Sequence, residues 1–354
     1  MIKNKSILIA IPTLGAGGME RAAVNVALSL DASDNKVSFF LLLGGEPFYS
    51  LPEHIQVFYG KRKISDKFSN IKSLIKLRKY VSTNKPDAIF SFSGMHSVYV
   101  IIATLFLKTK VFVFHRSNPN VVYGKINDVL NRIFFPHAAA LVVQTETANQ
   151  IFHKKYHTDK IIIFPNIVRA LSNIEIDYSS HTIVTITRLV PGKGVIELIR
   201  MFSKIRFNDW KLLFVGDGPL RNEAESLIGE LNMEPYVFLM GFQSNVDSFI
   251  ARSSIFAFAS ESEGFPNALL EAMSQGLACI SFDCPTGPGD MIDDGINGYL
   301  IPVNEFDTYE SKLLELMTNE SLRSKFGHNA KSMRIKHSSD TVMPQFLTDI
   351  DSYL

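Results

Sequence analysis

Two glutamates lie eight positions apart in the segment ESEGFPNALLEAM (261–273), where a strand-like run gives way to a helical pattern. Glu263 precedes the expected helix, and Glu271 lies one turn beyond Asn267 on the same face. The first backbone amides of a helix attract anions such as phosphate, and carboxylates beside them can accept hydrogen bonds from sugar hydroxyls. The segment therefore predicts a ligand with a phosphate core and polyhydroxyl groups on both sides. A plain surface position is the alternative for Glu271 taken alone.

Three more strand-to-helix turns are rich in glycine or in positive charge. They are GAGGMER, TRLVPGKG and VGDGP, at residues 15–21, 187–194 and 215–219. The glycines of the first turn would let the backbone approach a phosphate, but a tight turn explains them equally well. Arg188 and Lys193 can converge on one anionic ligand, although a solvated basic turn is the simpler interpretation of that motif alone. The first turn is not GxGxxG and no acidic residue follows the second strand, which disfavours a nicotinamide cofactor.

Strand and helix patterns alternate along the chain, which is typical of a parallel sheet covered on both faces. Apolar strands begin with SILIAIPTL, and the second half repeats the pattern from HTIVTITRL onwards. In that half we expect helices at about 194–207, 219–231, 245–252 and 266–275. A polar segment near 168–178 separates the halves. The 354 residues therefore predict two doubly wound α/β domains, 1–170 and 171–339, that face a ligand-binding cleft.

Charge is divided unevenly between the two halves. Residues 1–170 contain 22 Lys and Arg against 10 Asp and Glu, whereas residues 171–354 contain 14 against 25. The excess of positive charge in the first half predicts an anionic partner, such as a membrane surface, a nucleic acid or a phosphorylated acceptor. Within it, residues 61–85 resemble a basic amphipathic helix that docks on anionic lipid. Its expected apolar stripe is Phe68, Ile71, Leu74, Ile75 and Leu77. A helix that packs on the sheet and exposes its lysines is the alternative.

Several simple features bear on location and cofactors. The apolar runs at 6–11 and 98–107 are too short for a signal-peptide core or a membrane span, so we expect a cytosolic protein without a transmembrane helix. Cys279 and Cys284 indicate buried thiols in a reducing compartment. His153 and His157 lack further ligands at metal spacing, so zinc is not expected. Interleaved aromatic residues that would favour nucleic-acid binding are missing from the basic half.

Together these motifs resemble the retaining glycosyltransferases of family 4, in the GT-B class. The resemblance rests on GGMER, TRLVPGKG, VGDGP and above all ESEGFPNALLEAMSQGLACISFD followed by GINGYLIP, and it covers essentially the whole chain. It implies two Rossmann-like domains, the first binding the acceptor and the second the nucleotide-sugar, and a C-terminal helix at about 340–354 that packs back on the first. Relatives often carry a glutamate at the place of Asp290, so the role of that shorter carboxylate, and the sugar choice, stay open.

The resemblance also implies roles for individual residues. Arg188 and Lys193 would bind the donor diphosphate, Glu271 would hold the ribose hydroxyls, and Glu263 would lie by the donor sugar. The active-site histidine of the first domain matches His115 in VFVFHRSN best, with His96 in FSGMHS as the second candidate. The expected catalytic residues are Glu263, His115, Arg188 and Lys193. The expected donor-binding residues are Gly17, Gly18, Arg188, Lys193, Gly216, Phe265, Asn267, Ala268, Leu269 and Glu271, and the expected acceptor-binding residues are His96 and Arg116.

Such an enzyme is expected to stabilise the leaving diphosphate with cationic side chains and a helix N-terminus, without a metal or other cofactor. We expect same-face attack, in which the leaving phosphate oxygen takes the acceptor's proton. The predicted function is transfer of a hexose or N-acetylhexosamine from a UDP-sugar to a lipid-diphosphate-linked saccharide of a bacterial surface polysaccharide, at the inner face of the cell membrane. The alternatives are a soluble transferase or phosphorylase acting on a free sugar or glucan, and a non-catalytic nucleotide-sugar-binding protein.

Overall fold

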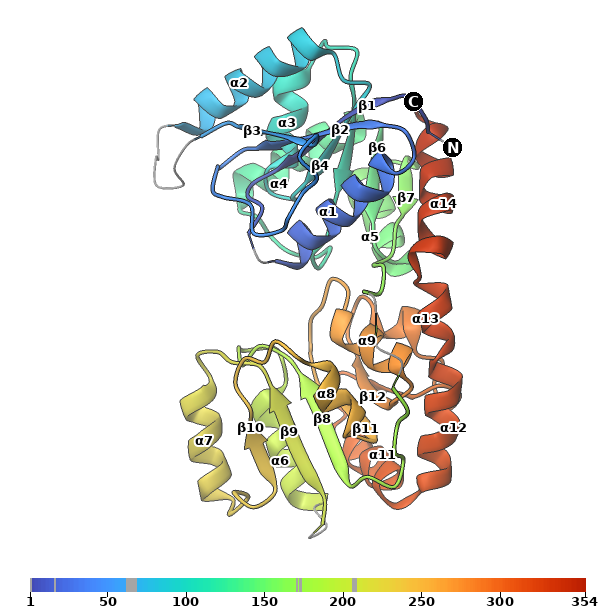
Figure 1. Ribbon diagram of the computed structural model, residues 1–354. Coiled ribbons are helices and arrows are strands. Elements are labelled where there is room, and N and C mark those ends of the chain that lie inside the picture. The colour runs from blue at the N-terminus through green and yellow to red at the C-terminus, as the bar shows by residue number, and fades with distance from the viewer. Residues whose placement is uncertain (1, 16, 62–68, 170, 172–173, 206–208) are drawn as a thin grey trace. The chain divides into compact units, whose positions relative to one another are not determined.

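A computed structural model of the chain describes residues 2–15, 17–61, 69–169, 171, 174–205 and 209–354. The chain divides into two compact units (Figure 1). The first is Met1–Asn166 together with Asp340–Leu354, and the second is Ile167–Ser339. Each unit is built on a parallel sheet, of seven strands in the first and six in the second. This architecture confirms the predicted fold of two Rossmann-like domains. Residue 170, the predicted domain boundary, lies outside the described residues.

The sheet of the first unit has the strand order β3-β2-β1-β4-β5-β6-β7. The strands are β1 (Ser6–Ile11), β2 (Lys36–Leu41), β3 (Gln56–Tyr59), β4 (Ala88–Phe92), β5 (Lys110–Phe114), β6 (Ala140–Val143) and β7 (Ile161–Ile163). The central strands β1 and β4 are buried along nearly their whole length. They read as continuous apolar runs because both faces of the sheet are covered. The edge strand β3 is only partly buried and was not predicted from the sequence.

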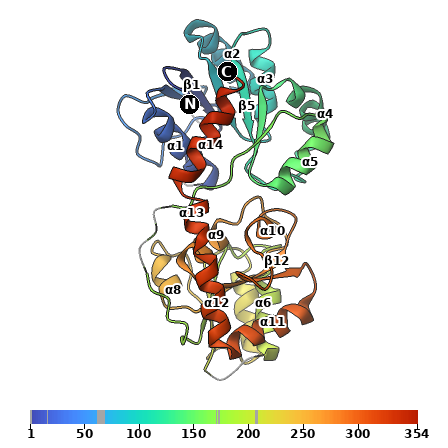
Figure 2. The ribbon, with the colours of Figure 1, turned by 90° about the vertical axis from the view of Figure 1, so that its right-hand side faces the viewer.

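Helices cover both faces of this first sheet. They are α1 (Gly18–Asp31), α2 (Ser69–Asn84), α3 (Ser97–Thr104), α4 (Lys125–Phe134), η1 (Phe135–His137), α5 (Glu146–Tyr156) and α14 (Ser339–Asp351). Apolar residues of α2, α3 and α5 pack together on one face, and α1 and α14 cover the other (Figure 2). In α14, Phe346 stacks on Phe164 with ring centroids 4.0 Å apart and also meets Phe90 and Phe114. The C-terminal helix thus contributes to the core of the first unit.

The prediction that the apolar residues of α2 form one stripe on a single face of the helix is wrong. Leu77 is fully buried and packs with the sheet, whereas Ile71 and Ile75 are 72% and 63% exposed. Phe68 lies outside the described residues. A helix that packs on a sheet turns only part of its surface toward it, so residues that look like one stripe in the sequence divide between the sheet and the outer surface.

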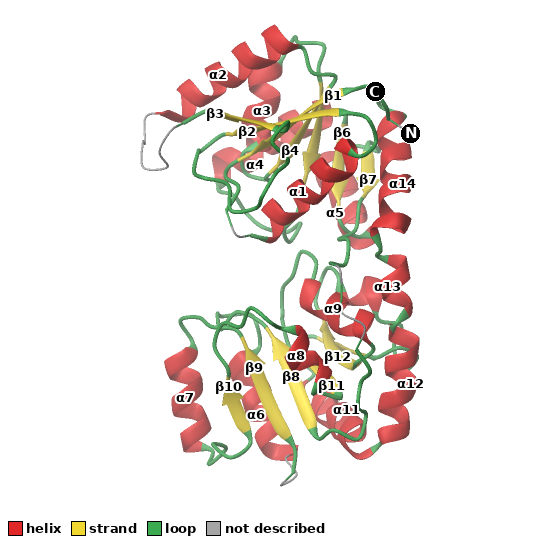
Figure 3. Ribbon diagram, in the orientation of Figure 1, coloured by secondary structure: helices red, strands yellow, loops and turns green. Residues whose placement is uncertain are grey.

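The sheet of the second unit has the order β10-β9-β8-β11-β12-β13 (Figure 3). Its strands are β8 (Thr182–Ile186), β9 (Lys211–Val215), β10 (Val237–Leu239), β11 (Ile255–Phe258), β12 (Ala278–Asp283) and β13 (Tyr299–Pro302). One face is covered by α6 (Val195–Ile205), α7 (Arg221–Glu230) and α11 (Phe306–Thr318). The other is covered by α8 (Asp247–Ala251), α9 (Asn267–Gln275), α10 (Pro288–Met291) and α13 (Ser332–Lys336). Helix α12 (Glu320–Ala330) contributes apolar residues to both cores.

The helices expected at 194–207, 219–231, 245–252 and 266–275 correspond to α6, α7, α8 and α9. Residues 206–207 lie outside the described residues, and α7, α8 and α9 are each a little shorter than predicted. Among the residues that the structure describes, every helix is too short or too polar to cross a bilayer.

Candidate active site

The strand order of the second sheet reverses between β8 and β11, and ligands of open α/β sheets bind at such a point. The turn after β8 (187–194) and the turn after β11 (259–266) both leave the sheet there, at the carboxyl ends of the strands. The two turns are joined directly. The backbone N–H of Glu261 donates to the carbonyl of Gly192 at 3.0 Å, and the Ser260 hydroxyl donates to the same carbonyl at 3.3 Å. Residues far apart in sequence therefore meet at the carboxyl edge of this sheet.

Lys193 and Glu263 form an ion pair across these two turns. Lys193 Nζ lies 2.6 Å from Glu263 Oε1, and the side chains are 17% and 15% exposed. The same ammonium donates to the Ser262 carbonyl at 3.2 Å, while the Thr286 hydroxyl donates to the Glu263 carbonyl. The exposed side chain of Arg188 belongs to the same turn as Lys193. The structure thus brings a cation and a carboxylate predicted from separate motifs into contact.

Two glycines allow this close approach of the turns. Gly194 has φ +67°, and a Cβ there would lie 2.0 Å from the carbonyl oxygen of Ala259. Gly216, in the turn after β9, has φ +141°, and its Cβ would lie 1.9 Å from the carbonyl oxygen of Thr187. Only glycine adopts these angles at little cost and leaves room for the neighbouring backbone. Gly216, predicted to bind the donor, therefore also has a packing role.

The turn after β11 leads into helix α9. Pro266 precedes the helix, whose first backbone bond runs from Leu270 N to the Pro266 carbonyl at 3.1 Å. The amides of residues 267–269 come before that bond, at the positive end of the helix. The side chains of Asn267 and Ala268 are half-buried, whereas that of Leu269 is fully buried. Because the Leu269 side chain is buried, only the backbone N–H of this residue could contact a ligand.

Two predicted residues beside this helix have structural contacts. The ring of Phe265 is buried and packs edge-on against the ring of His337, with centroids 5.7 Å apart. Asp290 Oδ2 accepts the backbone N–H of Gly287 at 3.2 Å and so caps the short helix α10. The shorter carboxylate at position 290 therefore has a local role at a helix start.

Glu271 has a partner that the sequence analysis missed. Arg169 Nε donates to Glu271 Oε2 at 3.0 Å, and another guanidinium N–H donates to Asp247 Oδ2 at 3.1 Å. All three side chains are half-buried. The hydrogen bond to Asp247, more than the proximity of Glu271, raises the pKa of Arg169 above its ordinary value. Arg169 therefore fixes the orientation of the carboxylate predicted to hold the ribose.

We expect Arg169→Met to raise the KM for the predicted nucleotide-sugar donor at least about tenfold and to leave kcat within about threefold. The reason is that one charge-assisted hydrogen bond contributes ~1.5–3 kcal/mol, and here it orients a binding group. Initial rates over a range of donor concentrations would measure both constants. Arg334→Met is the matched control, because Arg334 donates to the Leu171 carbonyl at 3.1 Å without touching Glu271. An unchanged donor KM in Arg169→Met would contradict the assigned role.

In the first unit, His115 follows β5 and is buried. Its Nε2 lies 3.1 Å from the Tyr123 hydroxyl, and its ring packs edge-on against Phe152 at 4.7 Å between centroids. Burial, with a smaller contribution from the charge of Lys155, lowers the pKa of His115 to about 3. The imidazole is thus neutral at physiological pH, where it can exchange hydrogen bonds but carries no positive charge.

We expect His115 to make the protein less stable as the pH falls from about 6.5 toward 3. Over this range the unfolded chain protonates the imidazole, with a pKa near ~6.5, while the folded chain does not. Between pH 7 and pH 5 the loss should be about 2 kcal/mol, since each pKa unit corresponds to ~1.36 kcal/mol. Urea unfolding of the wild type and of His115→Asn at both pH values would test this. The prediction fails if the two proteins lose equal stability on acidification.

The other predicted residues of the first unit are held in different ways. Burial lowers the pKa of Arg116 to about 9, and its guanidinium donates to the Phe164 carbonyl at 3.1 Å and to the Asn166 side chain. His96 directly precedes helix α3, with Ser93 Oγ 2.9 Å from its Nδ1. Burial first, and then the charge of Lys61, lowers the pKa of His96.

Glycines 17 and 18 lie at the start of α1. A Cβ at Gly17 would lie 2.1 Å from Glu20 Oε2, so a carboxylate of the same helix occupies the space beside this turn. The Tyr49 hydroxyl donates to the Gly17 carbonyl at 3.1 Å. The close packing is what a tight strand–helix turn requires.

Cys279 and Cys284 are buried free thiols. Within the described ranges, no cluster of three or more His, Cys, Asp or Glu side chains has the geometry of a metal site.

Comparison with known families places both halves of the chain. Residues 16–170 match the family described as Glycosyltransferase Family 4, and residues 171–333 match the family described as Glycosyl transferases group 1. A relative from Campylobacter jejuni is 28% identical over 345 residues, which cover 92% of this chain and 93% of the relative. Its name is N-acetylgalactosamine-N,N'-diacetylbacillosaminyl-diphospho-undecaprenol 4-alpha-N-acetylgalactosaminyltransferase.

Solved structures share the fold. The lipopolysaccharide outer core galactosyltransferase WaaB aligns with a TM-score of 0.83 and 20% identity, over 98% of this chain and 99% of that one. Anabaena Alr3699/HepE in complex with UDP aligns with a TM-score of 0.81 and 16% identity, over 98% of this chain and all (100%) of the other. With both domain matches and the observed architecture, the chain belongs to the GT-B glycosyltransferases, with a family 4 N-terminal part and a group 1 C-terminal part.

Proposed function

We propose that this glycosyltransferase moves a hexose or N-acetylhexosamine, with retention, from a UDP-sugar to a lipid-diphosphate-linked saccharide of a bacterial surface polysaccharide. The main support for a nucleotide-sugar donor is the Lys193–Glu263 ion pair beside the start of α9. The relative that acts on a diphospho-undecaprenol-linked acceptor and the galactosyltransferase of the lipopolysaccharide outer core support the acceptor half. The solved structure of Anabaena Alr3699/HepE with UDP has the same fold, which supports a UDP-linked donor.

In the proposed mechanism, the donor diphosphate lies against Arg188, Lys193 and the amides that open α9. The bond between the anomeric carbon and the diphosphate oxygen breaks, and the acceptor hydroxyl oxygen bonds to that carbon on the same face. The leaving phosphate oxygen takes the hydroxyl proton. Cations and oriented amides stabilise the charge that develops on the diphosphate, so the proposed reaction needs no metal. Glu263 keeps Lys193 in place and lies by the donor sugar, and Glu271 holds the ribose hydroxyls.

The acceptor is proposed to bind the first unit. His96, His115 and Arg116 lie in that unit, after strands β4 and β5. The excess of Lys and Arg in residues 1–170, 22 against 10 acidic residues, suits a diphosphate-bearing lipid at an anionic bilayer. We therefore also propose peripheral association with the inner face of the cell membrane.

The testing experiment is a transfer assay with purified protein in EDTA. A panel of UDP- and GDP-sugars is offered with and without a lipid-diphosphate-linked saccharide, and the anomeric configuration of the product is determined by NMR. Turnover of one UDP-sugar that requires the lipid acceptor, retains configuration and is lost in Glu263→Ala would support the proposal. Inversion, a requirement for metal, or transfer only to free sugars would each contradict the corresponding part.

A further inference from the structure

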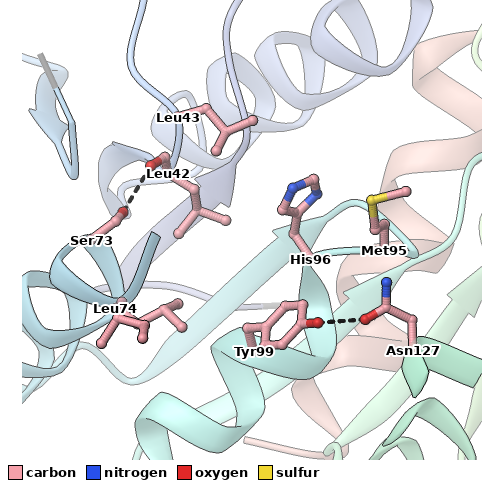
Figure 4. Close-up of a pocket in the computed structure, with 9 residues that line it drawn as sticks. Leu42, Leu43, Ser73, Leu74, Met95, His96, Tyr99 and Asn127 are labelled. Atoms are coloured by element: carbon pink, nitrogen blue, oxygen red, sulfur yellow. Dashed lines mark hydrogen bonds between the residues drawn. The ribbon is translucent and has the colours of Figure 1, made fainter. Parts of the chain in front are cut away.

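The first unit contains a pocket of about 370 Å³ next to His96, between helices α2, α3 and α4 (Figure 4). Most of its wall is apolar. The lining residues are Leu42, Leu43, Ile71, Ser73, Leu74, Met95, His96, Tyr99 and Asn127. Pockets of ~300–1,000 Å³ with apolar walls and a few polar groups are typical of small-ligand sites. This one lies on the loop after β4, beside the reversal of strand order between β1 and β4 in the first sheet.

The polar groups of the pocket are already oriented. Ser73 Oγ donates to the Leu42 carbonyl at 2.8 Å, and the Tyr99 hydroxyl bonds the Asn127 side chain. Ser93 lies at Nδ1 of His96, so a ligand would meet the opposite nitrogen, Nε2. Among the residues that the structure describes, none of the lining side chains is a carboxylate. The charge of the buried Lys61 is close enough to influence His96. An anionic group is therefore compatible with the His96 end.

The outer edge of the pocket is apolar as well. Ile71 and Met95 line it and are themselves exposed, at 72% and 40%. Exposed apolar side chains at the edge of a pocket are typical of a place where an apolar partner binds. The exposed Lys72 and Lys76 make the surface of α2 basic, which complements an anionic amphiphile.

We propose that this pocket binds the lipid end of the acceptor, with the first part of a prenyl chain against Leu74 and Ile71 and the adjoining diphosphate near His96. The inference rests on the proposed function, because it assumes a lipid-diphosphate acceptor, and it adds that the protein recognises the lipid itself. A soluble saccharide would gain nothing from the apolar wall, whereas a prenyl chain gains free energy for each buried carbon.

The test compares two acceptors with the same saccharide diphosphate, one on a polyprenyl chain and one on a butyl chain, in detergent without bilayers. Ile71→Gln is matched with Ile75→Gln. Both residues are exposed on α2, but only Ile71 lines the pocket. We expect the wild type to have a lower KM for the prenyl acceptor. Ile71→Gln should raise that KM about tenfold, the factor for ~1.4 kcal/mol of lost apolar burial, while the butyl acceptor changes less than about twofold.

The possible outcomes distinguish failure of the lipid-binding proposal for the pocket from failure of the proposed function. Equal KM values of the wild type for both acceptors, or equal effects of Ile71→Gln and Ile75→Gln, would overturn the pocket while leaving transfer to lipid-linked saccharides intact. Transfer to neither acceptor, with turnover on free sugars, would overturn the proposed function and the pocket together. A rise in prenyl-acceptor KM confined to Ile71→Gln would support both. Because both side chains are exposed, the variants are expected to fold, and donor hydrolysis provides an internal check.

Discussion

Lys193→Met is expected to lower kcat about 10²–10³-fold, the usual cost of removing one preorganised electrostatic contact to a developing charge. Lys193 Nζ is fixed by three acceptors, Glu263 Oε1 at 2.6 Å, the Ser262 carbonyl at 3.2 Å and Ser260 Oγ at 3.5 Å. Its position is thus set before the donor arrives. Because the proposed contact strengthens as negative charge builds on the leaving diphosphate, the loss should appear in kcat more than in the donor KM.

The matched control for this prediction is Lys204→Met. Lys204 Nζ lies 2.6 Å from Glu310 Oε1, the same distance as in the Lys193–Glu263 pair, but it lies at the end of α6, away from the turn that carries Lys193. The Lys204 side chain is exposed, and ion pairs at the surface contribute little to stability. We expect kcat to stay within about twofold. The assigned role of Lys193 fails if both variants lose the same activity, or if Lys193→Met keeps most of its kcat.

Gly194→Ala is expected to abolish most activity and to destabilise the second unit. A left-handed backbone costs an alanine ~1–2 kcal/mol, and the new Cβ would lie 2.0 Å from the Ala259 carbonyl oxygen. Relieving that overlap adds about 1–3 kcal/mol and moves apart the two turns that carry Lys193 and Glu263. A displacement of ~1 Å can reduce the rate about 10²-fold. We therefore expect a loss of at least about 10²-fold in kcat.

The control for Gly194→Ala lies two residues away. Gly192 also has a left-handed φ, +79°, but a Cβ there has nothing within 4 Å. Gly192→Ala should therefore show the backbone cost alone, ~1–2 kcal/mol. Trp210, the single tryptophan, is buried in the second unit, so its fluorescence during urea unfolding measures the stability of that unit. Similar losses in the two variants would show that packing against Ala259 does not hold the turns together.

Much of the second unit could be predicted because the patterns that specify its helices and turns lie within short stretches of sequence. The helices of the second half were predicted from short apolar patterns. Lys193 and Glu263 were both selected as ligand residues from the turns in which they occur. That the two touch could not be predicted, because their contact spans 70 residues and depends on β8 and β11 being neighbours in the sheet.

The prediction for α2 shows where local patterns fail. A helical period shows which residues share a side of a helix, but not which side meets the sheet. Leu77 is buried and Ile71 is exposed, although both were assigned to one stripe. Only the packing of α2 on the sheet distinguishes a core position from a residue at the edge of a pocket.

The sequence by itself determined the two α/β domains, the family and the glycine-rich or basic turns, because these depend on local periodicity and on short motifs at strand ends. Only the tertiary structure decided that Arg169 joins Glu271 to Asp247, contacts of 102 and 78 residues in sequence separation, and that His96 borders an apolar pocket. The physical reason is that hydrogen bonds and burial depend on distance in space, and chain crossovers in a parallel sheet bring together segments that share no local pattern.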